Sequence, residues 1–215
     1  VTLPRMRTPL LIGGAALAAA ATAAAAAPVL VSAPTVTGAT TVASTVHCTP
    51  GQWTGASSFT YTWQRGGFDV ASGQDLLLAP NQVGGVLSCH VVAADGAGGT
   101  TAADSAPFTV GRAQLTMRVT LTSPKRGVIL LKGTAAPTQV LVAGRAHAQL
   151  TVYRLLSDGA LLQISNSSAS VPASGRVTLR LRDTPGRHRY KLQLSPPDPY
   201  ATLPFITTLP LRVKR

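Results

Sequence analysis

Apolar and polar residues alternate in the C-terminal half of the chain. Leu115, Met117, Val119 and Leu121 are separated by threonine and arginine, a period of two that predicts a half-buried β-strand. Further candidate strands cover residues 127–133, 149–155, 161–165, 176–182, 187–194 and 209–213. Turn residues such as Asp158-Gly159 lie between them. Strands of this kind and number predict a β-sandwich.

Short apolar stretches also recur in the N-terminal half, at residues 41–46, 59–63 and 86–92. Glycine-containing turns separate them, at Pro50-Gly51, Gly66-Gly67 and Gly84-Gly85. Several short strands with frequent turns predict an antiparallel β-sandwich and not a helical fold. The predicted fold class is therefore all-β, with two consecutive β-sandwiches.

The first 27 residues follow a different pattern. Arg5 and Arg7 precede an uncharged run over residues 8–27, which ends in alanines that offer A-x-A cleavage frames. This layout is typical of a secretory signal peptide. The alternative is an uncleaved helix that anchors the chain in a membrane, although the run is barely as long as the roughly 20 residues that a span needs. We expect cleavage, and a protein that is secreted or stays at the cell envelope.

Charge divides the remaining chain in two. Residues 28–111 carry one arginine and four aspartates, a net charge of −3. Residues 112–215 carry 16 basic residues and three aspartates, a net charge of +13. Such a step predicts a boundary near Gly111. We therefore expect a signal peptide at 1–27, a first sandwich at 28–111 and a basic second sandwich at 112–215.

The two cysteines of the chain, Cys48 and Cys89, both lie in the first sandwich, with Trp63 between them. Because an exported chain meets an oxidising compartment, we expect them to form a disulfide. The order Cys-Trp-Cys is typical of immunoglobulin domains, where the tryptophan packs in the core against the disulfide that joins the two sheets. His47 and His90 each adjoin a cysteine, but alternation turns them outward from different sheets, which argues against a shared metal site.

Several motifs resemble known modules. Residues 49–55 read TPGQWTG, residues 61–65 read YTWQR, residues 87–91 read LSCHV, and Ser105-Ala106 precede a last strand. In this combination, residues of about 33–111 resemble the immunoglobulin-like modules of secreted actinobacterial proteins. Leu87 departs from the antibody-type pattern, which has a tyrosine at this position. The resemblance implies a binding or spacing module without catalysis.

The second sandwich has a resemblance of its own. Residues 148–154 read AQLTVYR, residues 174–179 read SGRVTL, and residues 186–192 read GRHRYKL. These segments are similar to the immunoglobulin-like or fibronectin-type repeats of bacterial surface proteins. The resemblance implies a second immunoglobulin-like or fibronectin-like sandwich, which must rely on its apolar core because it has no cysteine.

Alternation also predicts a basic face on the second sandwich. Arg187, Arg189 and Lys191 face outward from one strand, and Arg212 and Lys214 from the next. Sandwich topology places these strands side by side, with the strand of Tyr153 as a neighbour. The arginines of residues 176–182 fall on the opposite sheet. We predict an anion-binding face that consists of Arg187, Arg189, Lys191, Arg212, Lys214 and Tyr153.

The partners that suit such a face are an anionic cell-wall polymer, a glycan or a surface protein. Nucleic acid is disfavoured, because the face offers only Tyr153 for stacking. We expect no metal, no cofactor and no enzyme activity, since the sequence has none of the common catalytic motifs. The predicted function is that of a secreted or envelope-associated binding or adhesion protein. Two alternatives stay open: a passive spacer without a ligand, and a basic surface that reflects composition only.

Overall fold

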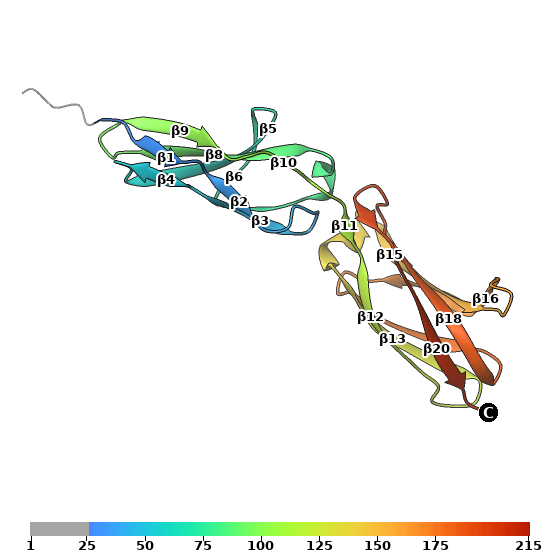
Figure 1. The fold of residues 1–215 in the computed structure, drawn as a ribbon. Helices are drawn as coiled ribbons and strands as arrows, with labels where there is room; N and C mark the ends of the chain where they lie inside the picture. Colours follow the sequence, from blue (N-terminus) through green and yellow to red (C-terminus); the bar gives the residue numbers. More distant parts are fainter. Residues whose placement is uncertain (1–25) are drawn as a thin grey trace, which may run out of the picture.

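Figure 1 shows the chain in a computed structural model that describes residues 26–215, with only the backbone described for residues 165 and 166. The described part consists mainly of β-strands, with two short 3-10 helices, η1 (Pro80–Gln82) and η2 (Thr138–Val140). The predicted all-β fold class is therefore confirmed. The predicted signal peptide lies outside the described residues, except for its last two positions. Among the described residues, no helix has the length and apolarity to cross a membrane.

The strands before Gly111 form the N-terminal sandwich. They are β1 (Val29–Ser32), β2 (Thr35–Thr37), β3 (Thr45–Thr49), β4 (Gln52–Thr54), β5 (Ser58–Arg65), β6 (Phe68–Ser72), β7 (Asp75–Leu77), β8 (Val86–Ala94), β9 (Thr100–Asp104) and β10 (Phe108–Thr109). One sheet has the order β2-β3-β7. The other has the order β10-β8-β5-β6, with β9 also paired to β8, and β1 pairs separately with β4.

The Cys48–Cys89 disulfide joins the two sheets of the N-terminal sandwich, as predicted. Cys48 comes from β3 and Cys89 from β8, with 6.3 Å between their Cα atoms. Trp63 lies directly opposite Cys89 in the ladder between β5 and β8, and all three side chains are fully buried. The Trp63 Nε1 atom donates a hydrogen bond to the carbonyl of Gly73 (3.0 Å), so the indole is buried without an unpaired donor.

The strands after Gly111 form the C-terminal sandwich. They are β11 (Ala113–Gln114), β12 (Thr116–Thr122), β13 (Val128–Ala136), β14 (Val142–Ala143), β15 (Ala146–Leu155), β16 (Leu161–Val171), β17 (Arg176–Arg182), β18 (Gly186–Ser195), β19 (Thr202–Leu203) and β20 (Phe205–Val213). One sheet has the order β12-β13-β17. The other has the order β14-β15-β18-β20, with β16 paired to β15, and β11 runs parallel to β19.

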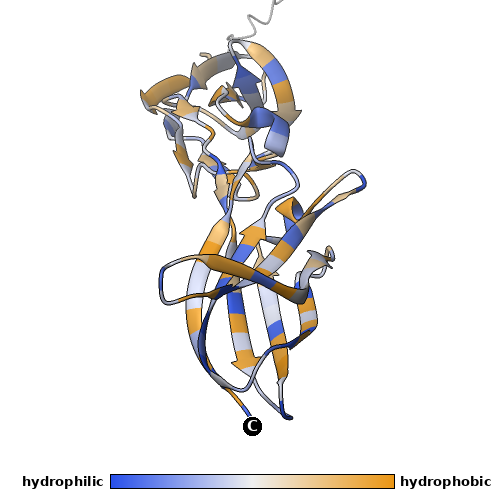
Figure 2. Cartoon of the chain, turned by 90° about the vertical axis from the view of Figure 1, so that its right-hand side faces the viewer, coloured by the Kyte–Doolittle hydropathy of each residue, from blue (hydrophilic) through white to orange (hydrophobic). Residues whose placement is uncertain are grey.

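Alternating burial marks the inner faces of these two sheets. Leu179 and Leu181 of β17, and Leu192 and Leu194 of β18, are buried, while the residues between them are exposed or half-buried. Figure 2 shows this alternation as bands of opposite hydropathy along the strands. The predicted period of two therefore determines which side chains reach solvent.

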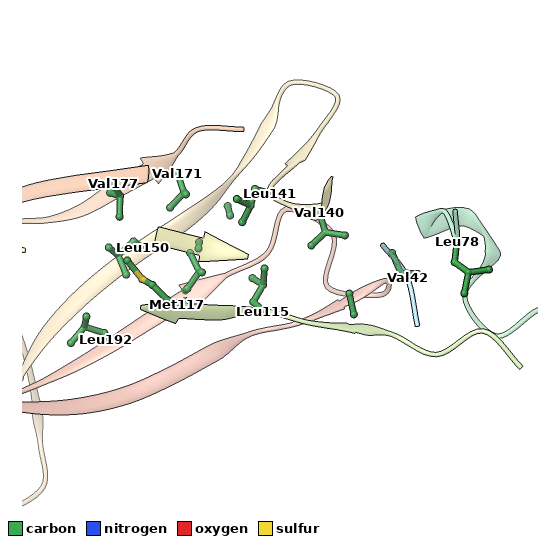
Figure 3. Close-up of a cluster of buried hydrophobic side chains, with 14 of the residues drawn as sticks. Val42, Leu78, Leu115, Met117, Val140, Leu141, Leu150, Val171, Val177 and Leu192 are labelled. Atoms are coloured by element: carbon green, nitrogen blue, oxygen red, sulfur yellow. The ribbon is translucent and has the colours of Figure 1, made fainter. Parts of the chain in front are cut away.

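Buried apolar side chains continue from one sandwich to the other (Figure 3). Val42 and Leu78 of the N-terminal sandwich and Val140 of η2 belong to one buried cluster. The chain passes between the sandwiches at Gly111, whose N–H donates to the carbonyl of Thr40 (2.7 Å). Among the described residues, every strand pair joins strands on the same side of Gly111. That the two sandwiches are separate domains stays a prediction.

Some predicted strand limits were wrong. Residues 41–44 do not belong to the predicted strand 41–46, because the backbone turns there: Ala43 has a φ of 66°, and Ser44 donates to the carbonyl of Thr41 (3.1 Å). The strand predicted at 161–165 extends to Val171 as β16, since the long strand β15 supplies a partner past an irregularity in register after Thr151. The last strand begins at Phe205, which pairs with Leu194.

Removing the disulfide tests its contribution to the N-terminal sandwich. We expect the double substitution Cys48→Ala and Cys89→Ala to lower the free energy of unfolding by about 4 kcal/mol, the chain-entropy value for a loop of this length. Both tryptophans lie in the N-terminal sandwich, so urea unfolding followed by tryptophan fluorescence measures this loss directly. An unchanged urea midpoint would contradict the assigned role, and amide exchange in β18 serves as a control for the other sandwich.

Candidate anion-binding face

Strand β18 carries the core of the predicted basic face. Tyr190 and Leu192 point into the sandwich and are fully buried. Arg187 and Arg189 occupy the alternate positions and are exposed, and Lys191 is half-buried. Because the buried side chains hold β18 in one register, the three cations lie in a row on the outer face of the sheet.

The neighbouring strands add to this row. Arg212 of β20 lies directly opposite Arg187, and Tyr153 of β15 lies directly opposite Lys191. Directly opposite residues on adjacent strands have Cβ atoms about 5 Å apart, and like charges in this arrangement destabilise the pair. The Arg187–Arg212 pair is therefore a local concentration of positive charge, and a bound anion would reduce the repulsion between the two guanidinium groups.

A groove of about 940 Å³ lies beside this pair. Arg187, Arg189 and Arg212 all line it, together with Pro210 and Leu211 of β20. Tyr153 and Lys191 lie further along the same outer face and do not line the groove. The structure thus brings three of the predicted residues together in one concave region and places two beside it.

Lys214 has a separate position, because it follows the end of β20. Its N–H donates a hydrogen bond to the hydroxyl of Ser123 (2.9 Å) and not to a neighbouring strand. Its carbonyl accepts a hydrogen bond from the N–H of Gly127 (3.1 Å). The Lys214 backbone therefore closes the end of the sandwich, and its exposed side chain extends the basic surface beyond the groove.

The three aspartates of the C-terminal sandwich are all used elsewhere. Asp158 accepts a hydrogen bond from the N–H of Ala160 (2.9 Å) and Asp198 one from the N–H of Tyr200 (2.9 Å), so both shape turns. Asp183 forms a salt bridge with Arg154 (2.7 Å). Among the described residues, no carboxylate pairs with a cation of the basic face.

A buried polar network around Asp183 reaches the groove through Arg154, which lines it, and the sequence pattern did not predict this network. The Asp183 side chain is only 5% exposed. Its Oδ1 accepts a hydrogen bond from Arg154, and its Oδ2 accepts one from the hydroxyl of Tyr190 (2.9 Å). A signal was present, because Arg154 occupies an inward position of an otherwise apolar alternation, two residues after Val152.

This network raises the pKa of Tyr190. Burial of the phenol is the main cause, and the hydrogen bond to Asp183 and the negative charge of its carboxylate act in the same direction. The charge of Arg154 acts in the opposite direction but does not outweigh them. Since Asp183 neutralises Arg154, this arginine stabilises the fold. The other cations that line the groove are Arg187, Arg189 and Arg212, and the described residues offer them no carboxylate partner.

The histidines beside the cysteines lie on different sheets, as predicted. His47 of β3 pairs with Asp75 of β7 through Nδ1 (2.7 Å). His90 of β8 pairs with Asp104 of β9 in the same way (2.7 Å). Each histidine thus has one carboxylate partner on an adjacent strand, an arrangement that links strands of the same sheet.

Comparisons with known proteins address the fold. The chicken interferon gamma receptor alpha chain superposes with a TM-score of 0.50 at 10% identity, over 85% of this chain and 98% of that chain. The fold is immunoglobulin-like. The N-terminal Ig1-2 module of the Drosophila receptor protein tyrosine phosphatase DLAR also matches, with a TM-score of 0.30 and 12% identity, over 88% of this chain and 100% of that chain.

The fibronectin(III)-like modules of Clostridium thermocellum CbhA match with a TM-score of 0.29 and 16% identity, over 83% of this chain and 94% of those modules. At 10% identity, the similarity to the interferon gamma receptor alpha chain shows the fold alone. No protein-family model and no curated protein matches the sequence. The resemblance of residues of about 33–111 to the immunoglobulin-like modules of secreted actinobacterial proteins therefore stays a prediction.

The substitution Tyr190→Phe tests the buried network. At neutral pH we expect a loss of about 2 kcal/mol in the free energy of unfolding, because one oxygen of the buried Asp183 carboxylate loses its donor. The raised pKa of Tyr190 adds a pH dependence. The stabilisation by the protonated phenol is complete below the unfolded pKa of about 10 and is lost as pH rises above it.

The difference in stability between wild type and Tyr190→Phe should therefore narrow at alkaline pH. Amide hydrogen exchange in β18, compared at pH values below and above 10, measures it for the C-terminal sandwich. A difference that stays constant or grows above this pH would contradict the assigned network.

Proposed function

We propose that the chain is a secreted or cell-envelope-associated binding protein without catalytic activity, whose C-terminal sandwich holds an anionic polymer on its basic face. The observation that carries this proposal is the Arg187–Arg212 pair, two cations that lie directly opposite each other beside a groove. Arg189 adds a third cation to the same groove. The nearby carboxylate of Asp183 is occupied by Arg154 and Tyr190.

A polymer suits this face better than a small anion. An exposed ion pair contributes only about 0.2–1 kcal/mol, so one contact does not hold a ligand. A chain with repeated charges engages Arg187, Arg189, Lys191 and Arg212 together, and each further contact is then intramolecular. The planar guanidinium groups bind carboxylate or phosphate oxygens in pairs, which adds geometric specificity.

The N-terminal sandwich supports the proposed location outside the cytoplasm. A disulfide such as Cys48–Cys89 forms and persists in oxidising compartments outside the cytoplasm. The polyanions available there include phosphate-bearing wall polymers and acidic glycans. The N-terminal sandwich carries a net negative charge and, in this proposal, positions the basic sandwich without contacting the polymer.

Substitution of the basic face tests the proposal. We expect the protein to sediment with cell-envelope material at low salt and to be released as salt rises, because screening weakens contacts between exposed charges. The combined substitutions Arg187→Gln, Arg189→Gln, Lys191→Gln and Arg212→Gln should lower envelope binding by about tenfold or more, a conservative sum of several exposed contacts.

The matched control replaces four cations outside this face, Lys125, Arg126, Arg145 and Arg215, all of which are exposed, by glutamine. We expect this control to keep most of the binding. Retention that does not depend on salt, or equal losses in the two variants, would contradict a specific basic face. A protein that stays in the soluble fraction at low salt would favour the alternative of a passive spacer.

A further inference from the structure

The opposite sheet of the C-terminal sandwich also has a cationic outer face. Arg118 of β12 and Arg176 of β17 lie on either side of Thr134 of β13 in the ladder. In the next outward row, Thr120 and Thr178 lie on either side of Lys132. We call these six residues the threonine–arginine face; Arg180 and Arg182 extend it along β17.

The threonine–arginine face is hollowed. A groove of about 470 Å³ crosses the three strands, and all six residues line it. Adjacent strands lie about 4.8 Å apart, so Arg118 and Arg176 stand roughly 10 Å from each other across Thr134. This spacing leaves room for one anionic group between the two guanidinium groups, with Lys132 in the neighbouring row.

The polar groups of this face are free to bind a ligand. Among the described residues, none of its three cations forms an ion pair. The hydroxyls of Thr116 and Thr122, at the ends of β12, bond to the backbone carbonyls of Ala136 and Leu130. In contrast, the described structure gives the hydroxyls of Thr120, Thr134 and Thr178 no protein partner, although they lie between the cations.

The chemistry of the face points to a class of ligand. Guanidinium, ammonium and hydroxyl groups are all hydrogen-bond donors, and the groove contains no carboxylate that would compete for them. A phosphate or sulfate ester offers more acceptor oxygens than a carboxylate does, so it can use both the cations and the hydroxyls. We propose that the threonine–arginine face is a second binding site, for phosphate or sulfate groups on a linear polymer.

One consequence rests on the proposed function. The threonine–arginine face and the basic face of β18 are the outer faces of two different sheets of one sandwich, so they point away from each other. If both bind, one molecule holds two polymer chains at once. The protein then cross-links an anionic polymer and does not merely adhere to it.

Fluorescently labelled polyphosphate serves as the probe for this site, with the full chain as the binding partner. The basic face is first disabled by Arg187→Gln, Arg189→Gln and Arg212→Gln, and residual binding is measured by fluorescence anisotropy. In this background, Arg118→Gln, Lys132→Gln and Arg176→Gln should weaken the residual affinity by about tenfold or more. The control Arg126→Gln, Arg145→Gln and Arg215→Gln changes the net charge equally and should weaken it by less than about threefold.

A variant that leaves the charge unchanged distinguishes a specific binding site from nonspecific attraction of a polyanion to a positively charged surface. The substitutions Thr120→Val, Thr134→Val and Thr178→Val keep the shape and the charge but remove the hydroxyls. We expect about a fivefold loss of affinity for polyphosphate. Dextran sulfate tests the sulfate alternative, and polygalacturonate, which has only carboxylates, should lose little affinity in this variant.

The outcomes for the two faces can be distinguished. If disabling the basic face leaves no residual binding, or if the threonine variant binds polyphosphate like its parent, the second site is wrong while the proposed function stands. If disabling the basic face has no effect but the threonine and arginine variants lose binding, the second site stands and the proposed function fails. If both faces bind polyphosphate, the wild type should cross-link polyphosphate-coated beads. A variant that lacks the cations of either face should not cross-link them.

Discussion

The two-residue alternation of the C-terminal strands decides what this protein presents to solvent. Leu179 and Leu181 fill one inner face and Leu192 and Leu194 the other, and each residue is buried. A slip of one position would place Arg180 or Arg189 in the apolar core, where an unpaired charge is very costly. The strand register that buries these leucines therefore also places a row of cations on the outer face of each sheet.

The C-terminal sandwich has too few carboxylates to neutralise these cations. The C-terminal sandwich has only three aspartates, and each serves the fold: two shape turns, and Asp183 neutralises Arg154 while it accepts the Tyr190 hydroxyl. Stability is thus supplied by buried contacts and by one internal ion pair. In the part of the chain that the structure describes, no carboxylate pairs with the cations of the two outer faces, which is the property that a polyanion-binding surface needs.

The sequence predicted those features that depend on local pattern or on a single long-range pair. The all-β class followed from alternation, and Cys48–Cys89 followed from the presence of two cysteines in a chain that we expected to be exported. The threonine–arginine face could not be predicted, because it requires the register of β12 and β17 against β13, which brings Arg118 and Arg176 to the two sides of Thr134. The Asp183 network depends likewise on where a loop places its carboxylate.

Nuclear magnetic resonance tests the central claim, that the exposed cations of the C-terminal sandwich hold a polyanion. The isotope-labelled full chain is titrated with polyphosphate, and the amide shifts of all strands are followed. We predict that the shifts concentrate on β12, β13, β17, β18 and β20 and disappear at high salt. Shifts that concentrate on residues 29–109, or that spread evenly over all exposed arginines and lysines, would contradict the account.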